Sequence, residues 1–202
     1  MDLILLRPGD QEVFGKDGKN NWDSGGSLIQ YAKDDYDDNL KNIGDGIAGK
    51  CIELVSVNQG MKQQVTTDVS NSARTSGRPI ITEFTCVKYV DKTSVKFYEY
   101  CLRAMPIGKG KDNPTQIFIC RNSGDKVANI LTISLRDAII SEIQFQSHPD
   151  DMPTEQFKLN FTEVLWAYTV QMADTGRAGT LASGWSLARN RPIGAFTGPT
   201  PT

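Results

Sequence analysis

A strand-like segment whose apolar face changes sides halfway constrains the fold of this chain most. In KLNFTEVLWAYTVQ (158–171), large apolar residues occupy odd positions and then even ones: Leu159 and Phe161, followed by Val164, Trp166, Tyr168 and Val170. Successive side chains of a strand point to opposite faces, so this strand buries one face and then the other. A bulge at Thr162–Glu163 that carries the strand into a second sheet is the favoured explanation, and a strand covered on both faces is the alternative.

A second long segment, ANILTISLRDAIISEIQFQSH (128–148), alternates more regularly. One parity holds large apolar residues: Leu131, Ile133, Leu135, Ile139, Ile143 and Phe145. The other parity is mostly polar, which is typical of an antiparallel strand with one buried face. A strand of this length is expected to bend, and we place the bend near Arg136–Asp137.

The other apolar segments predict shorter strands and one helix. Strands are expected over 1–6, 51–66, 80–90 and 116–121. Residues 91–108 predict the helix, and its expected core face is Tyr98, Cys101, Leu102 and Met105. Thr93 or Ser94 is expected to cap the helix, and Pro106 and Gly108 to end it.

Three segments carry few apolar residues. Residues 10–49 are rich in Gly, Asn and Asp, which indicates a loop-rich insertion with at most a short helix. Residues 67–79 predict an exposed loop that reaches away from the core, and residues after 172 an extended or partly ordered tail. We expect one domain over 1–190, followed by a tail over 191–202. Seven or eight strands and one helix predict a mainly β protein, either a barrel or a sandwich closed at one edge.

Composition and charge exclude several classes of protein. The 202 residues carry a net charge of −2, so no basic field attracts nucleic acid or an anionic membrane. No apolar run approaches the roughly 18 residues of a membrane span. The N-terminal MDLILLRPGD lacks the basic start and long apolar stretch of a signal peptide. We therefore expect a protein made in the cytoplasm, with any export by a route without a cleaved signal.

Two motifs are similar to those of serine hydrolases, but the position of the single histidine in the sequence does not fit either of them. WDSGGS (22–27) is similar to the surroundings of a protease serine, and GWSLA (184–188) to a nucleophile elbow. The single histidine, His148, follows the first motif and precedes the second, which is the wrong order for each family. GKGK (108–111) lacks the spacing and the Ser/Thr of a phosphate loop. We therefore predict no catalytic residues.

No metal or cofactor site is expected either. DDYDDN (34–39) matches the first calcium-loop positions, but Leu40 and Gly46 replace the required Gly and Glu. The cysteines lack zinc-ligand spacing and are expected to be free thiols: Cys51, Cys86, Cys101 and Cys120. A β-barrel enzyme or ligand-binder that uses the 10–50 insertion remains the alternative, with His148 or the Asp35/Asp37 cluster as the residues to test.

Three segments together resemble the haemolysin-coregulated protein family, Hcp. They are GRPIITEFTCVKYVDKTSVKFYEYC (77–101), LTISLRDAIISEIQFQ (131–146) and PTEQFKLNFTEVLWAYTVQ (153–171). GWSLARN (184–190) also resembles the closing segment of that family. The resemblance covers roughly 1–8 and 50–190, and departs in the longer 10–49 segment and after Asn190.

The resemblance implies a fold and a function. Hcp proteins are compact two-sheet β-barrels with one flanking helix, and they form six-membered rings that stack into the inner tube of type VI secretion systems. A spike protein (VgrG) caps the tube, a contractile sheath surrounds it, and small effectors travel in its lumen. The protein would be a structural subunit without cofactors, cytoplasmic before firing and then secreted. A tail-tube protein of another phage-like contractile machine is the alternative within this fold.

The resemblance also assigns a role to the 67–79 segment. It is similar to the extended loop with which Hcp subunits reach a neighbouring ring, so it would become ordered on contact rather than on folding. The residues expected at this inter-ring or inter-subunit contact are Asp68, Asn71, Arg74, Thr75 and Arg78. A plain mobile surface loop is the alternative.

Overall fold

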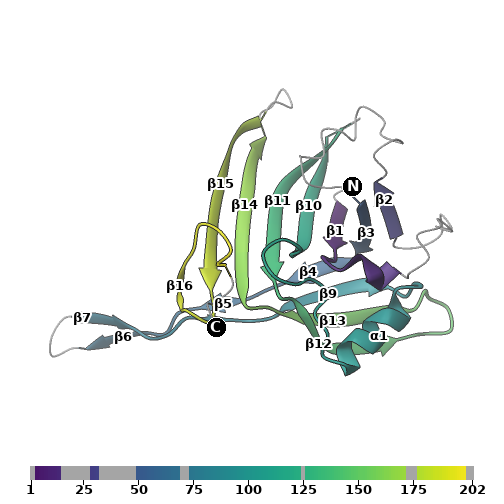
Figure 1. Cartoon of the computed structure of the whole chain (residues 1–202), viewed down its shortest axis with the longest axis horizontal. Coiled ribbons are helices and arrows are strands. Elements are labelled where there is room, and N and C mark those ends of the chain that lie inside the picture. Colours follow the sequence, from purple (N-terminus) through teal and green to yellow (C-terminus); the bar gives the residue numbers. More distant parts are fainter. Residues whose placement is uncertain are drawn as a thin grey trace.

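The computed structural model describes residues 3–14, 28–31, 49–68, 73–123, 126–171 and 177–198. Most of these residues belong to two β-sheets that pack face to face (Figure 1). The only α-helix of the described residues is α1 (Ser94–Leu102), and a 3-10 turn, η1, spans Gln11–Phe14. The expected mainly β fold with two sheets and one helix is confirmed. Among the described residues, neither sheet closes on itself into a barrel.

The larger sheet has eight antiparallel strands in the order β16-β15-β14-β11-β10-β1-β3-β2. Their bounds are β1 Leu3–Arg7, β2 Leu28–Tyr31, β3 Gly49–Leu54, β10 Thr115–Ser123, β11 Lys126–Arg136, β14 Glu163–Gln171, β15 Arg177–Ser186 and β16 Arg191–Pro192. The smaller sheet has the order β12-β13-β9-β4. It consists of β4 Ser56–Asn58, β9 Phe84–Tyr89, β12 Ile139–Gln146 and β13 Thr154–Asn160.

Two strand pairs outside these sheets form a long hairpin: β5 (Met61–Lys62) with β8 (Ile80–Ile81), and β6 (Val65–Asp68) with β7 (Ala73–Ser76). The described residues thus contain sixteen strands, about twice the expected number. Several of the additional strands have only two to four residues, too few for a periodic pattern to be recognised in the sequence.

Both sheets share two long strands that bend from one sheet into the other. The first runs from β11 into β12 through Asp137, whose φ is 51°, and Ala138. The second runs from β13 into β14 through Phe161 and Thr162. The expected bend at Arg136–Asp137 and the expected change of sheet near Thr162 are both confirmed. The change of sheet takes the form of a two-residue break between strands, not a bulge within one strand.

The core lies between the two sheets and extends under α1. Alternate residues of β9 and β13 point into it, so that Phe84 pairs with Leu159 and Cys86 with Phe157 in the strand register. The helix adds Phe97, whose ring lies edge-on to Phe157 with 5.1 Å between the centroids. One face of the smaller sheet therefore supports both the helix and the larger sheet.

The expected core face of the helix is correct in part, since Cys101 and Met105 pack against the core, but it is wrong for Leu102 and it omits two buried aromatic residues. Leu102 is 88% exposed, whereas Phe97 and Tyr100 are buried. The helix is only nine residues long and ends at Leu102, before Pro106. The sequence pattern assumed that the helix continues to Met105. This longer helix placed the predicted apolar face at a different angle around the helix axis from the observed one.

One strand face also differs from its expected pattern. Ala138 and Ile140 are buried, whereas Phe145 is 59% exposed. The β12–β13 register shifts between Ile140 and Glu142, so that Ile140 lies opposite the buried Leu159 and Ile143 opposite the buried Phe157, and the core-facing positions change from even to odd numbers. A single parity for 131–145 could not anticipate that irregularity.

A buried ion pair attaches the helix to the smaller sheet. The Lys88 ammonium lies 2.8 Å from the Glu155 carboxylate, and both side chains are 0% exposed. Ser94, at the start of α1, donates to Glu155 (3.0 Å) and accepts from Lys88 (3.0 Å). Tyr98 donates to the other carboxylate oxygen at 2.9 Å. Burial and the hydrogen bond to Glu155 raise the pKa of Tyr98 to about 12.

Asp91 closes this cluster. Thr93 occupies the N-cap position of α1, as expected, but its side chain makes no capping hydrogen bond to the helix. The Asp91 carboxylate accepts hydrogen bonds from the backbone N–H and the hydroxyl of Thr93, at 2.7 and 2.5 Å. Its second oxygen lies 3.1 Å from the Lys88 ammonium. The cluster explains why a Lys, an Asp and a Ser are spaced as they are in the KYVDKTS segment.

We expect Lys88→Met to destabilise the fold by about 3–5 kcal/mol, because it leaves the Glu155 carboxylate buried without a cation. The double variant Lys88→Met/Glu155→Leu should recover part of this loss. Urea unfolding followed by circular dichroism measures both. Lys96→Met is the control, since Lys96 pairs with Glu99 on the surface and should cost less than about 1 kcal/mol. Equal midpoints for Lys88→Met and the wild type would contradict the role of the pair.

Candidate assembly surfaces

A hairpin projects from the body between β4 and β9 (Figure 1). We call residues 59–82 the arm. Its strands pair through β5–β8 and β6–β7. Between these pairs the Gly77 N–H donates to the Gln64 carbonyl at 2.9 Å, and at the base the Thr82 N–H donates to the Gly60 carbonyl at 2.9 Å. The described part of the arm is thus a hairpin with its own backbone hydrogen bonds and not the unpaired loop that was expected. That the segment becomes ordered only on contact stays a prediction.

Four of the five predicted contact residues lie on the described part of the arm. Asp68 ends β6, and Arg74 and Thr75 lie in β7 opposite Thr67 and Thr66. Asn71 lies outside the described residues.

Arg78 lies at the base of the arm rather than along its paired strands. Its guanidinium donates to the Leu187 carbonyl at 2.9 Å, which ties the base to the segment between β15 and β16. The sequence therefore indicated the correct segment, but it did not separate residues of the arm strands from a residue at the base.

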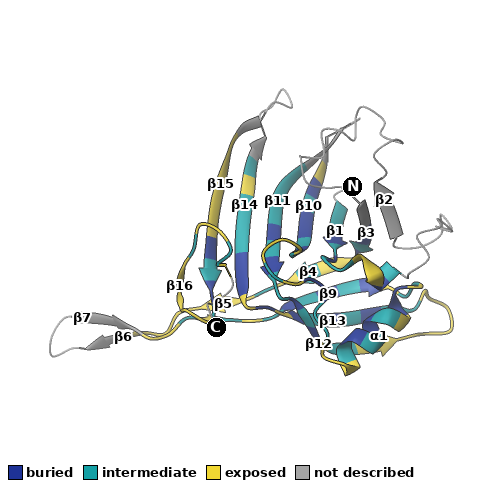
Figure 2. Cartoon of the chain, viewed as in Figure 1, coloured by how far each residue is buried: buried dark blue, intermediate teal, exposed yellow. Residues whose placement is uncertain are grey.

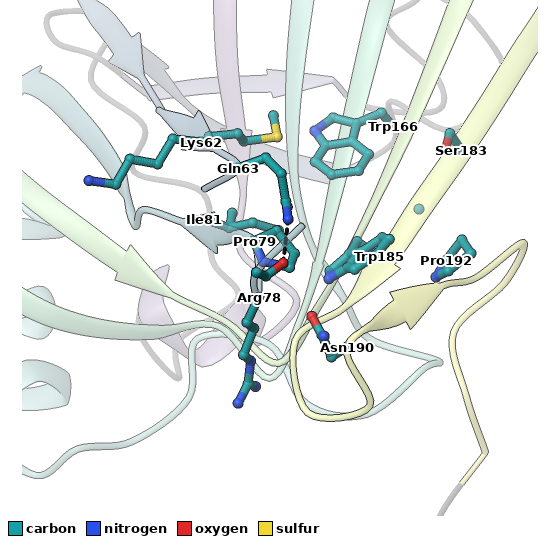
Figure 3. A pocket seen from close by; sticks show the side chains of 13 residues that line it. Lys62, Gln63, Arg78, Pro79, Ile81, Trp166, Ser183, Trp185, Asn190 and Pro192 are labelled. Carbon is teal, nitrogen blue, oxygen red and sulfur yellow. Dashed lines mark hydrogen bonds between the residues drawn. The ribbon is translucent and has the colours of Figure 1, made fainter. Parts of the chain in front are cut away.

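A groove of about 1050 Å³ lies where the arm meets β14, β15 and β16. We call it the arm-base groove. Its lining residues are Met61, Lys62, Gln63, Gly77, Arg78, Pro79, Ile81, Trp166, Ser183, Gly184, Trp185, Asn190 and Pro192. Figure 3 shows the rings of Trp166 and Trp185 beside the arm base, with the charged ends of Lys62 and Arg78 directed away from them. The groove is thus apolar inside and cationic at its rim.

Gly184 allows the wall of this groove to pack closely. A Cβ atom there would lie 2.3 Å from Leu165 Cδ2 and 2.9 Å from the carbonyls of Val164 and Ile193. Because two of these atoms belong to the backbone, no side chain could be accommodated without moving a strand. This requirement explains the glycine before Trp185 in the GWSLARN segment, which sequence reasoning noted only as a resemblance.

The core-facing side of the larger sheet continues beyond the core. Along β14, Val164 is 0% exposed while Tyr168 is 47% exposed. Tyr168 pairs with Leu131 on one side and with Leu181, 76% exposed, on the other. Figure 2 shows exposed positions on β14 and β15 above the buried part of the sheet. This extension, which we call the upper apolar face, was not identified from the sequence as a surface.

A polar cluster fixes the C-terminal segment at the point where the long strands change sheet. The Thr197 N–H and hydroxyl donate to the Glu163 carboxylate at 3.0 and 2.6 Å. Arg136 donates to the same carboxylate (3.2 Å) and to the Thr197 carbonyl (2.8 Å). Burial acts to raise the pKa of Glu163, but the hydrogen bonds from Thr197 and Arg136 outweigh it and lower the pKa below 4.5.

The described residues hold no grouping that resembles a metal centre: no three His, Cys, Asp or Glu side chains come together there. The acidic DDYDDN segment and WDSGGS lie outside the described residues. His148 is exposed and contacts Gln146 at 2.8 Å. No helix among the described residues is long and apolar enough to cross a membrane.

The four cysteines are free thiols, as expected, and three of them are buried in strands: Cys51, Cys86 and Cys120, with Cys101 half-buried on α1. Burial raises the pKa of Cys51 and of Cys120 to about 12. These thiols stay protonated at neutral pH and act as packing groups.

The structure thus consists of two packed sheets, with a projecting arm and an exposed apolar surface beyond the core. In the part of the chain that the structure describes, the distinctive surface features are this arm, the groove at its base and the exposed apolar side chains of β14 and β15. The family model described as "Type VI secretion system effector, Hcp" matches residues 45–168. The chain belongs to the Hcp family, which confirms the resemblance. This family consists of structural secreted proteins of type VI secretion systems.

Solved structures share the fold. A type six secretion system protein superposes with a TM-score of 0.69 at 17% identity, covering 96% of this chain and 100% of that one. Hcp1 from Salmonella typhimurium gives 0.59 at 17% identity over 95% and 99%. A type VI secretion system effector from Yersinia pestis gives 0.54 at 16% identity over 91% and 99%. A search of curated protein sequences found no significant match.

We expect the docking of Thr197 to weaken in acid. Because the pKa of Glu163 is lowered in the folded state, its contribution is present above pH 4.5 and is lost as the pH falls through the folded pKa. Glu163→Gln should therefore lose about 1–3 kcal/mol at pH 7 and show a flatter loss of stability below pH 4.5 than the wild type. Urea unfolding at a series of pH values measures this difference. Parallel pH profiles for the two proteins would contradict the assignment.

Proposed function

We propose that this protein is the ring subunit of a type VI secretion inner tube. Six copies form a ring with a central lumen, and rings stack into a tube that is expelled with its spike. Family membership and a fold shared over nearly the whole chain support the proposal. The main observation in support of this proposal is the arm. The arm is a hairpin whose strands pair with each other, and it extends away from the core of its own subunit.

The proposed partners follow from that role. The protein associates with itself within and between rings, with the spike protein VgrG at the tip, with the contractile sheath outside, and with small effectors in the lumen. It resides in the cytoplasm before firing and is then secreted. Its role is mechanical and needs no catalytic residue or cofactor.

The mass of the purified protein in solution tests the assembly directly. Light scattering on the eluting peak, with electron micrographs of the same fraction, should give six times the chain mass of 22.3 kDa and rings with a central hole. A monomer that persists at high protein concentration would contradict the proposal, because ring association strengthens with concentration.

The arm is proposed to contact the next ring through Asp68, Asn71, Arg74 and Thr75, whereas Arg78, at the base of the arm, is proposed to take part in a contact between subunits of one ring. We expect Arg74→Glu to shorten tubes in electron micrographs while the ring mass and the thermal midpoint stay unchanged, because the substitution lies in a projecting hairpin. Lys111→Glu, an exposed residue outside the arm, is the control. If Arg74→Glu forms tubes of wild-type length, the arm does not make the stacking contact.

The upper apolar face is proposed to be covered within the assembly, since exposed apolar surface of this kind marks contact sites. Leu181→Asp should weaken ring association by about tenfold or more, because it would place a charge in an apolar contact. Its effect on monomer stability should stay within about 0.5 kcal/mol, since Leu181 is 76% exposed. Thr180→Asp, on the opposite face of the same strand, is the control. Sedimentation measures association, and an unchanged ring for Leu181→Asp would exclude this face.

A further inference from the structure

The molecule presents two chemically opposite surfaces at different places along its long axis. The arm projects at one end, with its base beside β15 and β16, and the turn between β12 and β13 lies at the other end (Figure 1). A surface at one end that fits a different surface at the other end allows head-to-tail association of identical subunits. Such heterologous contacts generate closed rings when the rotation between subunits closes.

The arm-base groove offers apolar walls and positive charge. Its described lining contains two tryptophans, Trp166 and Trp185, together with Met61 and Ile81 from the arm. The charged residues among the described lining are Lys62 and Arg78, and no acidic side chain is among them. The matching occupant is therefore a short segment that carries apolar side chains and carboxylates.

The β12–β13 turn has this chemistry. Residues 147–152 read SHPDDM, and Asp150 and Asp151 are both exposed. Met152 is 58% exposed, and Phe145, on the strand that leads into the turn, is 59% exposed. The turn and the strand that leads into it thus offer exposed apolar side chains together with carboxylates, which is the combination that the arm-base groove fits.

Local hydrogen bonds hold the turn in one shape. The Asp151 N–H donates to the His148 carbonyl at 3.3 Å, and the Met152 N–H to the Asp151 carboxylate at 2.8 Å. The base is fixed to β9 by the Val90 N–H, which donates to the Pro153 carbonyl at 2.9 Å. A pre-shaped segment loses little conformational entropy on docking, which favours its use in an assembly contact.

We propose that the 147–152 turn of one subunit docks in the arm-base groove of the next subunit of the ring. Met152 and Phe145 pack against the tryptophan-lined wall, and the carboxylates of Asp150 and Asp151 face Lys62 and Arg78 at the rim. This inference rests on the proposed ring function and names the seam between neighbouring subunits. It is distinct from the arm contact between rings, so the two are measured separately: the seam by ring mass and the arm by tube length.

Charge exchange tests the seam. One variant carries Asp150→Lys and Asp151→Lys, which makes turn and groove both positive; a second carries Lys62→Glu and Arg78→Glu, which makes both negative. Each alone should weaken ring association by about tenfold or more. A chain that carries all four substitutions should form rings again, because every seam regains opposite charges. Lys109→Glu/Lys111→Glu, on exposed residues outside both surfaces, is the control for charge reversal as such.

An equimolar mixture of the first two variants gives a sharper result. The turn of one variant matches the groove of the other, so rings should form in which the two variants alternate. Native mass spectrometry should then show three copies of each in a six-membered ring. The defects of the single-sided variants should also shrink at about 1 M salt, where the screening length falls to about 3 Å.

The outcomes separate this inference from the proposed function. If the wild type and both single-sided variants all form normal rings, the proposed seam is wrong, and the proposed ring function is unaffected. Loss of rings in both variants without recovery in the four-substitution chain or in the mixture would also overturn the seam, provided that circular dichroism shows folded protein. A wild-type protein that never forms rings would overturn the proposed function, and the seam with it.

Discussion

Two bent strand pairings hold this structure together. β11 pairs with β14 in the larger sheet, where Arg136 lies opposite Glu163, and β12 pairs with β13 in the smaller sheet, where Ile139 lies opposite Asn160. Both strands therefore change sheet side by side. Because the same two strands belong to both sheets, the angle between the sheets is fixed by backbone hydrogen bonds, and the core residues fill the space that those bonds define.

The other features are arranged around this junction. The Glu163 carboxylate that receives Thr197 lies at the first residue of β14, so the C-terminal segment is tied to the point where the strand enters the larger sheet. The Lys88–Glu155 pair holds α1 against the smaller sheet. With these connections in place, β14 and β15 extend past the core, and their exposed apolar residues remain for contacts with other molecules.

The sequence predicted the fold better than the surfaces. The parity change between Phe161 and Val164 and the long alternation through Ile133 are properties of strands that a single sequence reveals. The arm was predicted as a loop, because 67–79 carries few apolar residues. Backbone pairing between the two strands of the arm does not require apolar side chains. Hydrogen bonds such as that from the Gly77 N–H to the Gln64 carbonyl therefore leave no signal in the hydrophobic pattern of the sequence.

The sequence by itself determined that this is a mainly β protein of the Hcp family, with a strand that passes between two sheets near Thr162. Apolar periodicity and family motifs are local properties, so one chain is enough to read them. Only the tertiary structure decided that Trp166, Trp185 and Met61 meet in one groove, and that the turn between β12 and β13 lies at the end of the molecule opposite the arm. Distances between residues so far apart in the chain depend on how the sheets pack, which no local pattern encodes.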